Sequence, residues 1–147
     1  MALFTAGCAT GLWSKIFNAS DDSKHVDARQ PTLDSEIVAL IETSRLSVKE
    51  PREGWSGRFF HSQNMTFAYY TVKAGAWIHE HSHPNDEVWN IIDGQLELTI
   101  AGQTQMAGPG CAAVIPPNTA HSVKALTDVK AIVVDYPRRN SIGGIAL

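Results

Sequence analysis

The chain has 147 residues, of which 44% are hydrophobic and 18% are charged. This length and composition suit one globular domain with a hydrophobic core. Its 12 basic and 15 acidic side chains give a net charge of -3 without a basic run, so we expect no nucleic-acid partner. The two cysteines, Cys8 and Cys111, show neither a CxxC spacing nor the density of a disulfide scaffold, which is compatible with a reducing cytoplasm.

The amino-terminal part begins with a fairly apolar stretch up to Phe17, and a polar linker follows over residues 18–30. We do not expect a signal peptide, because no Lys or Arg precedes the apolar stretch and glycine and serine residues interrupt it. No stretch approaches the ~20 apolar residues of a membrane helix. We therefore expect a cytoplasmic protein without a membrane partner. The apolar segment is either a poorly ordered leader or a segment that packs on a neighbouring subunit.

One short helix is predicted after this linker. Asp34 is its expected cap, and the apolar residues that follow at helical spacing are Ile37, Val38, Leu40 and Ile41. Residues 1–55 are thus predicted to form an extension with one short helix. Residues 56–147 are predicted to form one barrel domain.

The chain after Trp55 is predicted to be made of strands. Short runs rich in Val, Ile, Thr and aromatic residues are separated by Gly, Pro, Asn and Asp. The runs cover residues 65–72, 77–83, 88–92, 95–100, 112–115, 121–126 and 129–136. Asp93-Gly94 and Ala101-Gly102 supply the positive φ that tight hairpins require. The pattern predicts an antiparallel β-sandwich or a small barrel, an all-β fold.

Histidines alternate along the second of these runs. Side chains two residues apart on a strand share a face, so His79, His81 and His83 are expected to point the same way. If that face is the barrel interior, Glu87 returns to it after a turn and His121 arrives from a later strand. Three imidazoles and one carboxylate can hold a transition-metal ion and leave positions for water or substrate. We predict a metal site at His81, His83, Glu87 and His121 rather than polar residues at a loop edge.

The spacing of these residues resembles the two motifs of the cupin family. The first motif is glycine, five residues, His-x-His, three or four residues, glutamate, six residues and glycine, and its matches are Gly75, His81, His83, Glu87 and Gly94. The second motif is matched in part, by Gly110, Pro116 and His121, with Asn118 where glycine is usual and Ala125 where asparagine is usual. The resemblance covers about residues 65–136. It implies a double-stranded β-helix, or jelly-roll barrel.

The predicted cofactor is one divalent transition metal per chain. Imidazole and carboxylate ligands suit Fe, Mn, Ni and Zn alike, so the identity of the ion stays open. Four protein ligands on a six-coordinate ion leave two positions for substrate oxygens or O₂. Absence of a cysteine ligand argues against a purely structural zinc site.

Further candidate residues surround this predicted ion. His79 is the candidate catalytic proton donor or acceptor, although an extra histidine is as often a hydrogen-bonded spectator. Trp89 and Ile91 have the parity of Glu87 along a regular strand and are candidate substrate-pocket residues, although filling the core is the commoner role. Of the adjacent Tyr69 and Tyr70 one must face inward, and Tyr69 is the pocket candidate.

Two classes of function fit these residues. The first is a metal-dependent enzyme acting on a small oxygen-rich metabolite by isomerase, cyclase, lyase or dioxygenase chemistry. The alternative is a non-enzymatic module that binds a metal and a small ligand, which the intact ligand set disfavours. Arg138 and Arg139 are able to attract a carboxylate, but two arginines after the last strand are more often solvated surface. We expect a homodimer, because two-fold pairing protects the edge strands of a small jelly roll.

Overall fold

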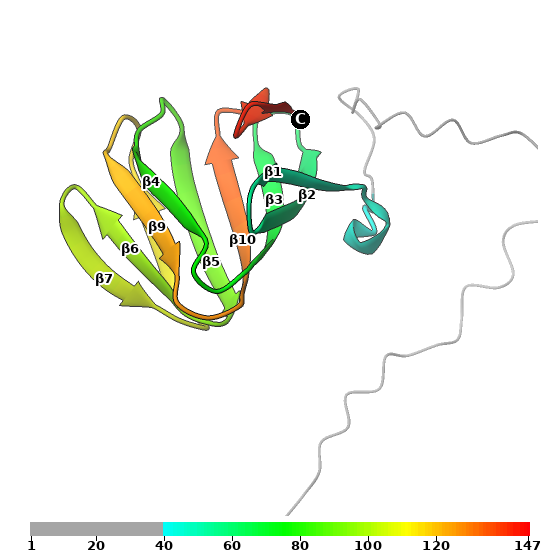
Figure 1. Cartoon of the computed structure of the whole chain (residues 1–147). Coiled ribbons are helices and arrows are strands. Elements are labelled where there is room, and N and C mark those ends of the chain that lie inside the picture. The colour runs from blue at the N-terminus through cyan, green and yellow to red at the C-terminus, as the bar shows by residue number, and fades with distance from the viewer. Residues whose placement is uncertain (1–39) are drawn as a thin grey trace, which may run out of the picture. The chain divides into compact units, whose positions relative to one another are not determined.

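Two antiparallel sheets form the body of the protein in the computed structural model, which describes residues 40–147 (Figure 1). The six-stranded sheet contains, in spatial order, β1 (Val48–Arg52), β2 (Trp55–His61), β3 (Thr66–Val72), β10 (Val129–Tyr136), β5 (Asp86–Asp93) and β8 (Ala112–Ile115). The four-stranded sheet contains β4 (Trp77–His81), β9 (His121–Ala125), β6 (Leu96–Ile100) and β7 (Gln103–Ala107). A terminal hairpin pairs β11 (Ser141–Ile142) with β12 (Ile145–Ala146). This architecture confirms the predicted all-β jelly roll.

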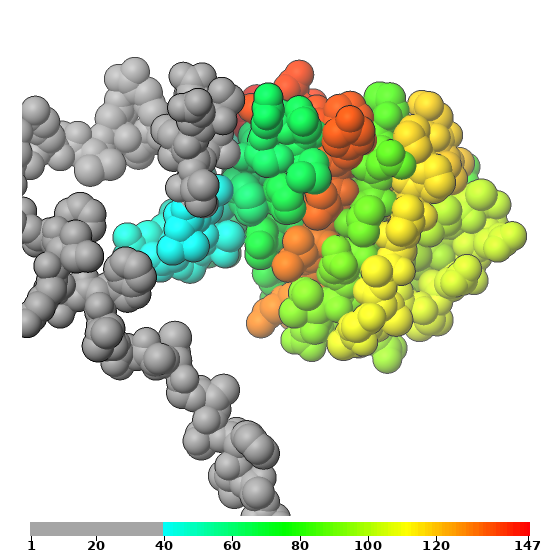
Figure 2. All heavy atoms as spheres, turned by 180° about the vertical axis from the view of Figure 1, so that it is seen from behind, coloured from blue at the N-terminus to red at the C-terminus, as the bar shows by residue number. Residues whose placement is uncertain are grey.

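The strand order of the larger sheet brings together segments that are far apart in the sequence. β10 lies between β3 and β5, and all its pairs are antiparallel. Figure 2 shows this order from behind, with the orange β10 between the green strands of β3 and β5 and the yellow β8 beyond. The last long strand of the chain therefore becomes a central strand, next to the strand that follows the histidine motif.

The core lies between the inner faces of the two sheets. Residues alternate between buried and less buried positions along β2, β3, β5 and β10, as expected for strands that are covered on one face. The larger sheet contributes three packed aromatic side chains, Trp55, Tyr70 and Trp89, whose ring centroids lie 5.5 to 6.3 Å apart. The smaller sheet contributes aliphatic partners that include Leu96, Leu98, Val123 and Ala125.

The turns follow the predicted chemistry, with one difference. Ala101 and Gly102 both have positive φ, 49° and 76°, and join β6 to β7 in a tight hairpin. Gly94 has a φ of 79°, but the Asp93-Gly94 turn leads from one sheet to the other instead of closing a hairpin. A side chain at Gly94 would also meet the Asp128 carbonyl. Asn118 adopts a φ of 60°, so asparagine serves here where a left-handed residue is needed.

β1, β2 and β7 lie outside the strand runs predicted from the sequence, as does the terminal hairpin. β1 pairs with β2, β2 also pairs with β3, and β7 pairs with β6. The start of the predicted helix falls outside the described residues. Its last positions, Leu40 and Ile41, are not helical, and a short 3₁₀ turn follows at Thr43–Arg45. Leu40 is exposed, and a short apolar helix face without a packing partner is not stable. Within residues 40–147 no helix is long and apolar enough to cross a membrane.

Candidate metal centre

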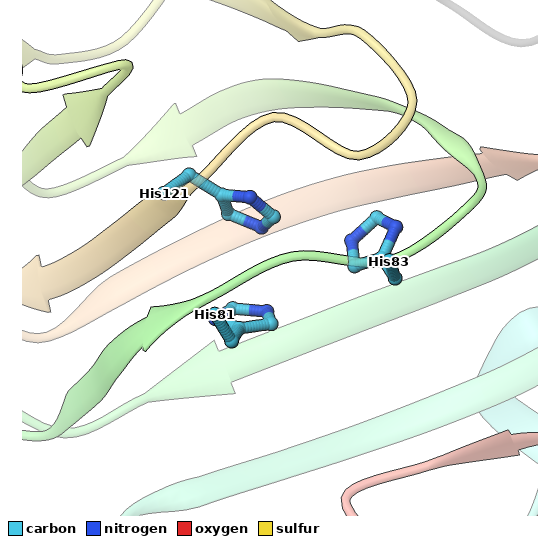
Figure 3. A group of neighbouring side chains, drawn as sticks. All are labelled: His81, His83 and His121. Carbon is cyan, nitrogen blue, oxygen red and sulfur yellow. The ribbon is translucent and has the colours of Figure 1, made fainter.

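Three imidazoles converge at one end of the four-stranded sheet. His81 ends β4, His83 lies in the loop after it, and His121 begins β9 (Figure 3). His81 and His121 are paired across the two strands, and their ring centroids are 4.2 Å apart. The ring of His83 lies 5.0 Å from His121 and 5.7 Å from His81. One ring nitrogen of each residue lies within 4.8 Å of the other two, so a single ion is within reach of all three.

Backbone carbonyls orient two of these rings. Nδ1 of His81 lies 2.9 Å from the carbonyl oxygen of His79, and Nδ1 of His121 lies 2.8 Å from that of Thr119. A carbonyl only accepts hydrogen bonds, so each Nδ1 carries the proton and each Nε2 of the neutral ring has a free lone pair. Nε2 of His121 is buried and has no hydrogen-bond partner among the described residues. This tautomer is the one that a metal ligand requires.

Glu87 brings a carboxylate to the same point from β5. The residue is 5% exposed, and its Oε2 lies 3.1 Å from Nε2 of His83 while Oε1 lies 3.6 Å from Nε2 of His121. Neighbouring donors around an octahedral ion with bonds of about 2.1 Å are separated by about 3 Å. The arrangement therefore fits a metal ion. The structure brings the four predicted ligands together, and their role as ligands stays a prediction.

The ionisation of Glu87 also fits this role. Burial by itself would raise the pKa of Glu87, but the nearby imidazoles of His121 and His83 and the indole donor of Trp89 outweigh it and hold that pKa far below its usual value. The indole Nε1 of Trp89 donates to Oε1 over 2.5 Å. Burial lowers the pKa of His81, which favours its neutral form. For His121, burial has the same effect, but the carboxylate of Glu87 and the Thr119 carbonyl reverse it and raise the pKa.

Two charged residues that the sequence did not single out as site residues complete the cluster. Asp135 on β10 is paired with Glu87 across the sheet and is fully buried. Nη1 of Arg139 lies 3.1 Å from Oδ1 of Asp135 and 3.4 Å from Oε2 of Glu87, so the expectation that Arg139 is a solvated surface residue was wrong. Oδ2 of Asp135 has no partner among the described residues. Burial and then the charge of Glu87 raise the pKa of Asp135 to about 6.

A signal for Asp135 was present in the sequence. The preceding inward positions of β10 are Val129, Ala131 and Val133, and Asp135 continues the same parity. An acidic residue at an inward position of an apolar strand is unusual without a partner or a function. Arg139 had no comparable signal, because its side chain reaches the cluster only through the path of the chain after β10.

His79 does not share the face of the other histidines, which corrects the prediction. Ile78 pairs with Val123 but His81 pairs with His121, so β4 contains one extra residue at this point, a β-bulge. The bulge reverses the parity, and His79 is exposed beside Trp77 with ring centroids 4.1 Å apart. The proposed proton transfer by its side chain depended on the shared face, and this position does not support it. His79 contributes its carbonyl instead.

The predicted pocket residues divide between two environments. Trp89 lines the pocket as predicted, whereas Ile91 is buried in the core and is not part of the pocket lining. Tyr69 lies on the outer face of β3 beside Phe60, with ring centroids 6.0 Å apart. Tyr70 is the inward residue, and it replaces Tyr69 as the pocket tyrosine. Alternation along a strand shows that one of two adjacent residues faces inward, but the strand register is needed to tell which one.

A small pocket with a volume of about 30 Å³ lies beside the histidine cluster and is partly open to solvent. Its polar or ionisable lining residues are Arg52, His81, Glu87, Asp135 and Arg139. Its other lining residues are Trp55, Tyr70, Ile78, Trp89, Val123, Val133 and Ile142. Several polar groups that converge beside an apolar wall are typical of a small-molecule site.

Comparisons with known proteins agree with this fold. Residues 68–136 match the model of the Cupin domain family. This segment is a cupin domain, and the structure has the cupin fold.

Three similar proteins illustrate the range of the superfamily. A protein of Streptomyces coelicolor described as uncharacterized protein SCO3923 is 26% identical over 81 residues, which cover 54% of this chain and 77% of that protein. KdgF from Halomonas sp. superposes with a TM-score of 0.67 at 22% identity, over 71% of this chain and 97% of that chain. Ectoine synthase from P. lautus superposes with a TM-score of 0.63 at 16% identity, over 72% of this chain and 81% of that chain. The fold is therefore one that enzymes use.

Proposed function

We propose that the chain is a metal-dependent enzyme that acts on a small oxygen-rich metabolite, such as an enol, a keto acid, a phenol or a sugar acid. The observation that supports this best is the convergence of His81, His83 and His121 beside a pocket, with the Glu87 carboxylate 3.1 Å from His83 and 3.6 Å from His121. The buried, unpartnered Nε2 of His121 adds to it, because a purely structural histidine in that position would be expected to have a hydrogen-bond partner.

The four residues would hold one divalent transition metal, for which Fe, Mn, Ni and Zn remain candidates. Such an ion, when bound, polarises a substrate oxygen as a Lewis acid or, if it is redox active, reacts with O₂. The residues around the ligands have separate tasks. The carbonyls of His79 and Thr119 fix the imidazole rings, and the indole of Trp89 fixes the Glu87 carboxylate.

Asp135 is the proposed proton-transfer group, in place of His79. Its pKa of about 6 lies close to neutral pH, and its buried Oδ2 has no partner among the described residues. A group with these properties both accepts and releases a proton readily near pH 7. Arg139 holds the other oxygen of Asp135 in place over 3.1 Å. The aromatic side chains of Trp55, Tyr70 and Trp89 form an apolar wall of the pocket.

Two kinds of reaction are proposed for this site. Isomerase, cyclase or lyase chemistry needs only Lewis-acid and proton-transfer groups, and Zn supports it without O₂. Dioxygenase chemistry needs a redox-active ion and consumes O₂. Similarity to ectoine synthase supports the use of this fold for catalysis and does not choose between the options.

The test is to purify the full chain without added metal and to quantify bound elements by plasma mass spectrometry, together with His81→Ala and His121→Ala. We expect close to one ion per chain in the unaltered protein and its loss in both variants, with an unchanged circular dichroism spectrum. His61→Ala is the control, because His61 at the end of β2 forms a hydrogen bond with Thr66 on β3 and lies outside the cluster. Fe, Mn or Ni leads to oxygen-uptake screens, and Zn leads to anaerobic isomerase and lyase assays. Absence of metal from every protein contradicts the proposal and favours a non-enzymatic binding module.

The cytoplasmic location and the homodimer stay predictions. β7 and β8 are edge strands of the two sheets, and Met106 and Val114 on them are exposed within the described chain. Exposed apolar edge strands are commonly protected by pairing with a second copy. Light scattering coupled to gel filtration tests this, with twice the mass of the chain as the expected result.

A further inference from the structure

We propose that Arg52 makes the pocket a receptor for a second acidic group of the substrate, so that the substrate class is a small dicarboxylate or another acid with an additional oxygen ligand for the ion. The inference rests on the proposed function and deepens it. Arg52 is the last residue of β1 and is paired with Trp55 across the β1–β2 turn. Its side chain lines the pocket together with His81 and Glu87, although β1 is the strand farthest from β8 in its sheet.

The two arginines of the pocket have different surroundings. Arg139 is held by both buried carboxylates, 3.1 Å from Asp135 and 3.4 Å from Glu87. Arg52 forms neither an ion pair nor a side-chain hydrogen bond with any other described residue, because both nearby carboxylates are directed to Arg139. Arg52 is half-buried and is not among the residues with buried, unpartnered polar atoms, so its guanidinium keeps access to solvent at the pocket. It is therefore free to bind the carboxylate of a ligand.

The surroundings of the Tyr70 hydroxyl indicate that the two arginines lie near the two buried carboxylates. Burial raises the pKa of Tyr70 most, and the charges of Glu87 and Asp135 add to it. The charges of Arg139 and Arg52 act on the same hydroxyl in the opposite direction. Tyr70 is paired with Gly57 on one side and Ala131 on the other, so its ring is fixed at the centre of the sheet. Arg52 therefore reaches the same interior region as the carboxylate cluster.

The charge balance of the pocket favours an anion. Glu87 and Asp135 offset Arg139 and Arg52 when all four are ionised, and a divalent ion held by the histidines adds two positive charges. One planar guanidinium matches one carboxylate through two parallel hydrogen bonds. The apolar wall of Trp55, Trp89 and Ile142 suits a short carbon chain or ring between the acidic group and the ion.

The experiment compares binding of dicarboxylates and monocarboxylates of equal length by calorimetry. The probes are malonate, succinate and glutarate, each paired with propionate, butyrate or valerate, and the protein is the full chain with one equivalent of Zn²⁺. We expect at least one dicarboxylate to bind about tenfold or more tightly than its monocarboxylate, because a hydrogen-bonded charge pair contributes that much. Arg52→Ala should abolish the preference, and Arg52→Lys should retain part of it.

Arg138→Ala is the matched control, because it removes the same charge from an exposed position outside the pocket. It should keep the preference for the dicarboxylate. The inference is overturned if no dicarboxylate is preferred, if Arg52→Ala keeps the preference, or if Arg138→Ala loses it equally. Zinc content is measured on the same samples. If the parent protein and Arg52→Ala both bind zinc but the parent protein does not prefer a dicarboxylate, only the further inference is rejected. If the parent protein binds no zinc, the proposed function is rejected.

Discussion

The two sheets contribute different chemistry to the same site. The four-stranded sheet and the loop after β4 supply imidazoles, His81, His83 and His121, oriented in part by backbone carbonyls. The six-stranded sheet supplies the carboxylates, Glu87 on β5 and Asp135 on β10. Imidazole ligands near a sheet end need mainly correct geometry. Buried charges need partners, and the larger sheet provides them from strands that are adjacent in space and distant in sequence.

This difference has an energetic side. Burying Glu87 and Asp135 on adjacent strands places two like charges together, which opposes folding unless each is paired. Arg139 lies between them and makes one contact with each carboxylate. The outer face of the same sheet shows no such conflict, since Phe60 and Phe67 stack there with ring centroids 4.7 Å apart. Charged side chains that are buried at an energetic cost, on the inner face only, are expected at a functional site.

The largest expected effect comes from a substitution that tests whether Glu87 is a metal ligand or only a counter-charge. Glu87→Gln keeps the shape of the side chain and removes its charge, and we expect it to lose bound metal as completely as His121→Ala does. Both losses should exceed the ~10–100-fold typical of groups that only orient a ligand. Metal affinity by competition with a chelator is the measurement. Near-normal metal affinity in Glu87→Gln would show that Glu87 only balances charge near the ion and is not a ligand.

A smaller effect is expected from removing the hydrogen bond that orients Glu87. Trp89→Phe deletes the indole donor to Oε1 and should lower metal affinity by about tenfold. Trp55→Phe is the matched control, because Nε1 of Trp55 is buried without a hydrogen-bond partner among the described residues. Its metal affinity should stay unchanged. Equal losses in both variants would mean that packing of the aromatic wall, and not the hydrogen bond, positions the carboxylate.

The raised pKa of Asp135 predicts a pH dependence of stability. Between the unfolded pKa of about 4 and the folded pKa of about 6, the folded state binds the additional proton, so its contribution to stability falls as pH rises. The free energy of unfolding of the metal-free parent minus that of Asp135→Asn should therefore fall over this window, by at most about 1.4 kcal/mol per pH unit, and level off above it. Urea denaturation at several pH values measures the difference.

Asp128→Asn is the control for this prediction. A backbone hydrogen bond from Ala74, together with Lys73, lowers the pKa of Asp128, so its contribution is lost only as pH falls below about 4. The corresponding difference should stay flat from pH 5 to pH 8. A flat or rising difference for Asp135→Asn would remove the basis for proton transfer by Asp135.

The smallest effect is expected at His79. Because the bulge turns its side chain outward, His79→Ala should leave metal content unchanged and alter the free energy of unfolding by no more than about 0.5 kcal/mol. Mass spectrometry and urea denaturation are the measurements. Loss of turnover on an identified substrate, with metal retained, would restore His79 as the proton-transfer residue.

Much of the fold and the ligand set was predictable because the relevant signals are local. Alternation and turn residues indicated strands from residue 65 onward, and the spacing of His81, His83 and Glu87 is contained in one short segment. The errors arose where local rules fail. A regular strand was assumed through His79, and one extra residue in β4 reversed the parity. Tyr69 was chosen over Tyr70 without knowledge of the register.

The sequence by itself determined the all-β class and the four candidate ligands, because alternation within strands and the positions of the histidines and Glu87 can be read directly, and the resemblance to the cupin motifs implied the jelly roll. Only the tertiary structure decided that Asp135, Arg139 and Arg52 line the same pocket. Their positions depend on the pairing of β10 with β5 and on the placement of β1 at the opposite edge of the sheet from β8. Such long-range pairings arise from the packing of the whole core and leave no periodic pattern in the sequence.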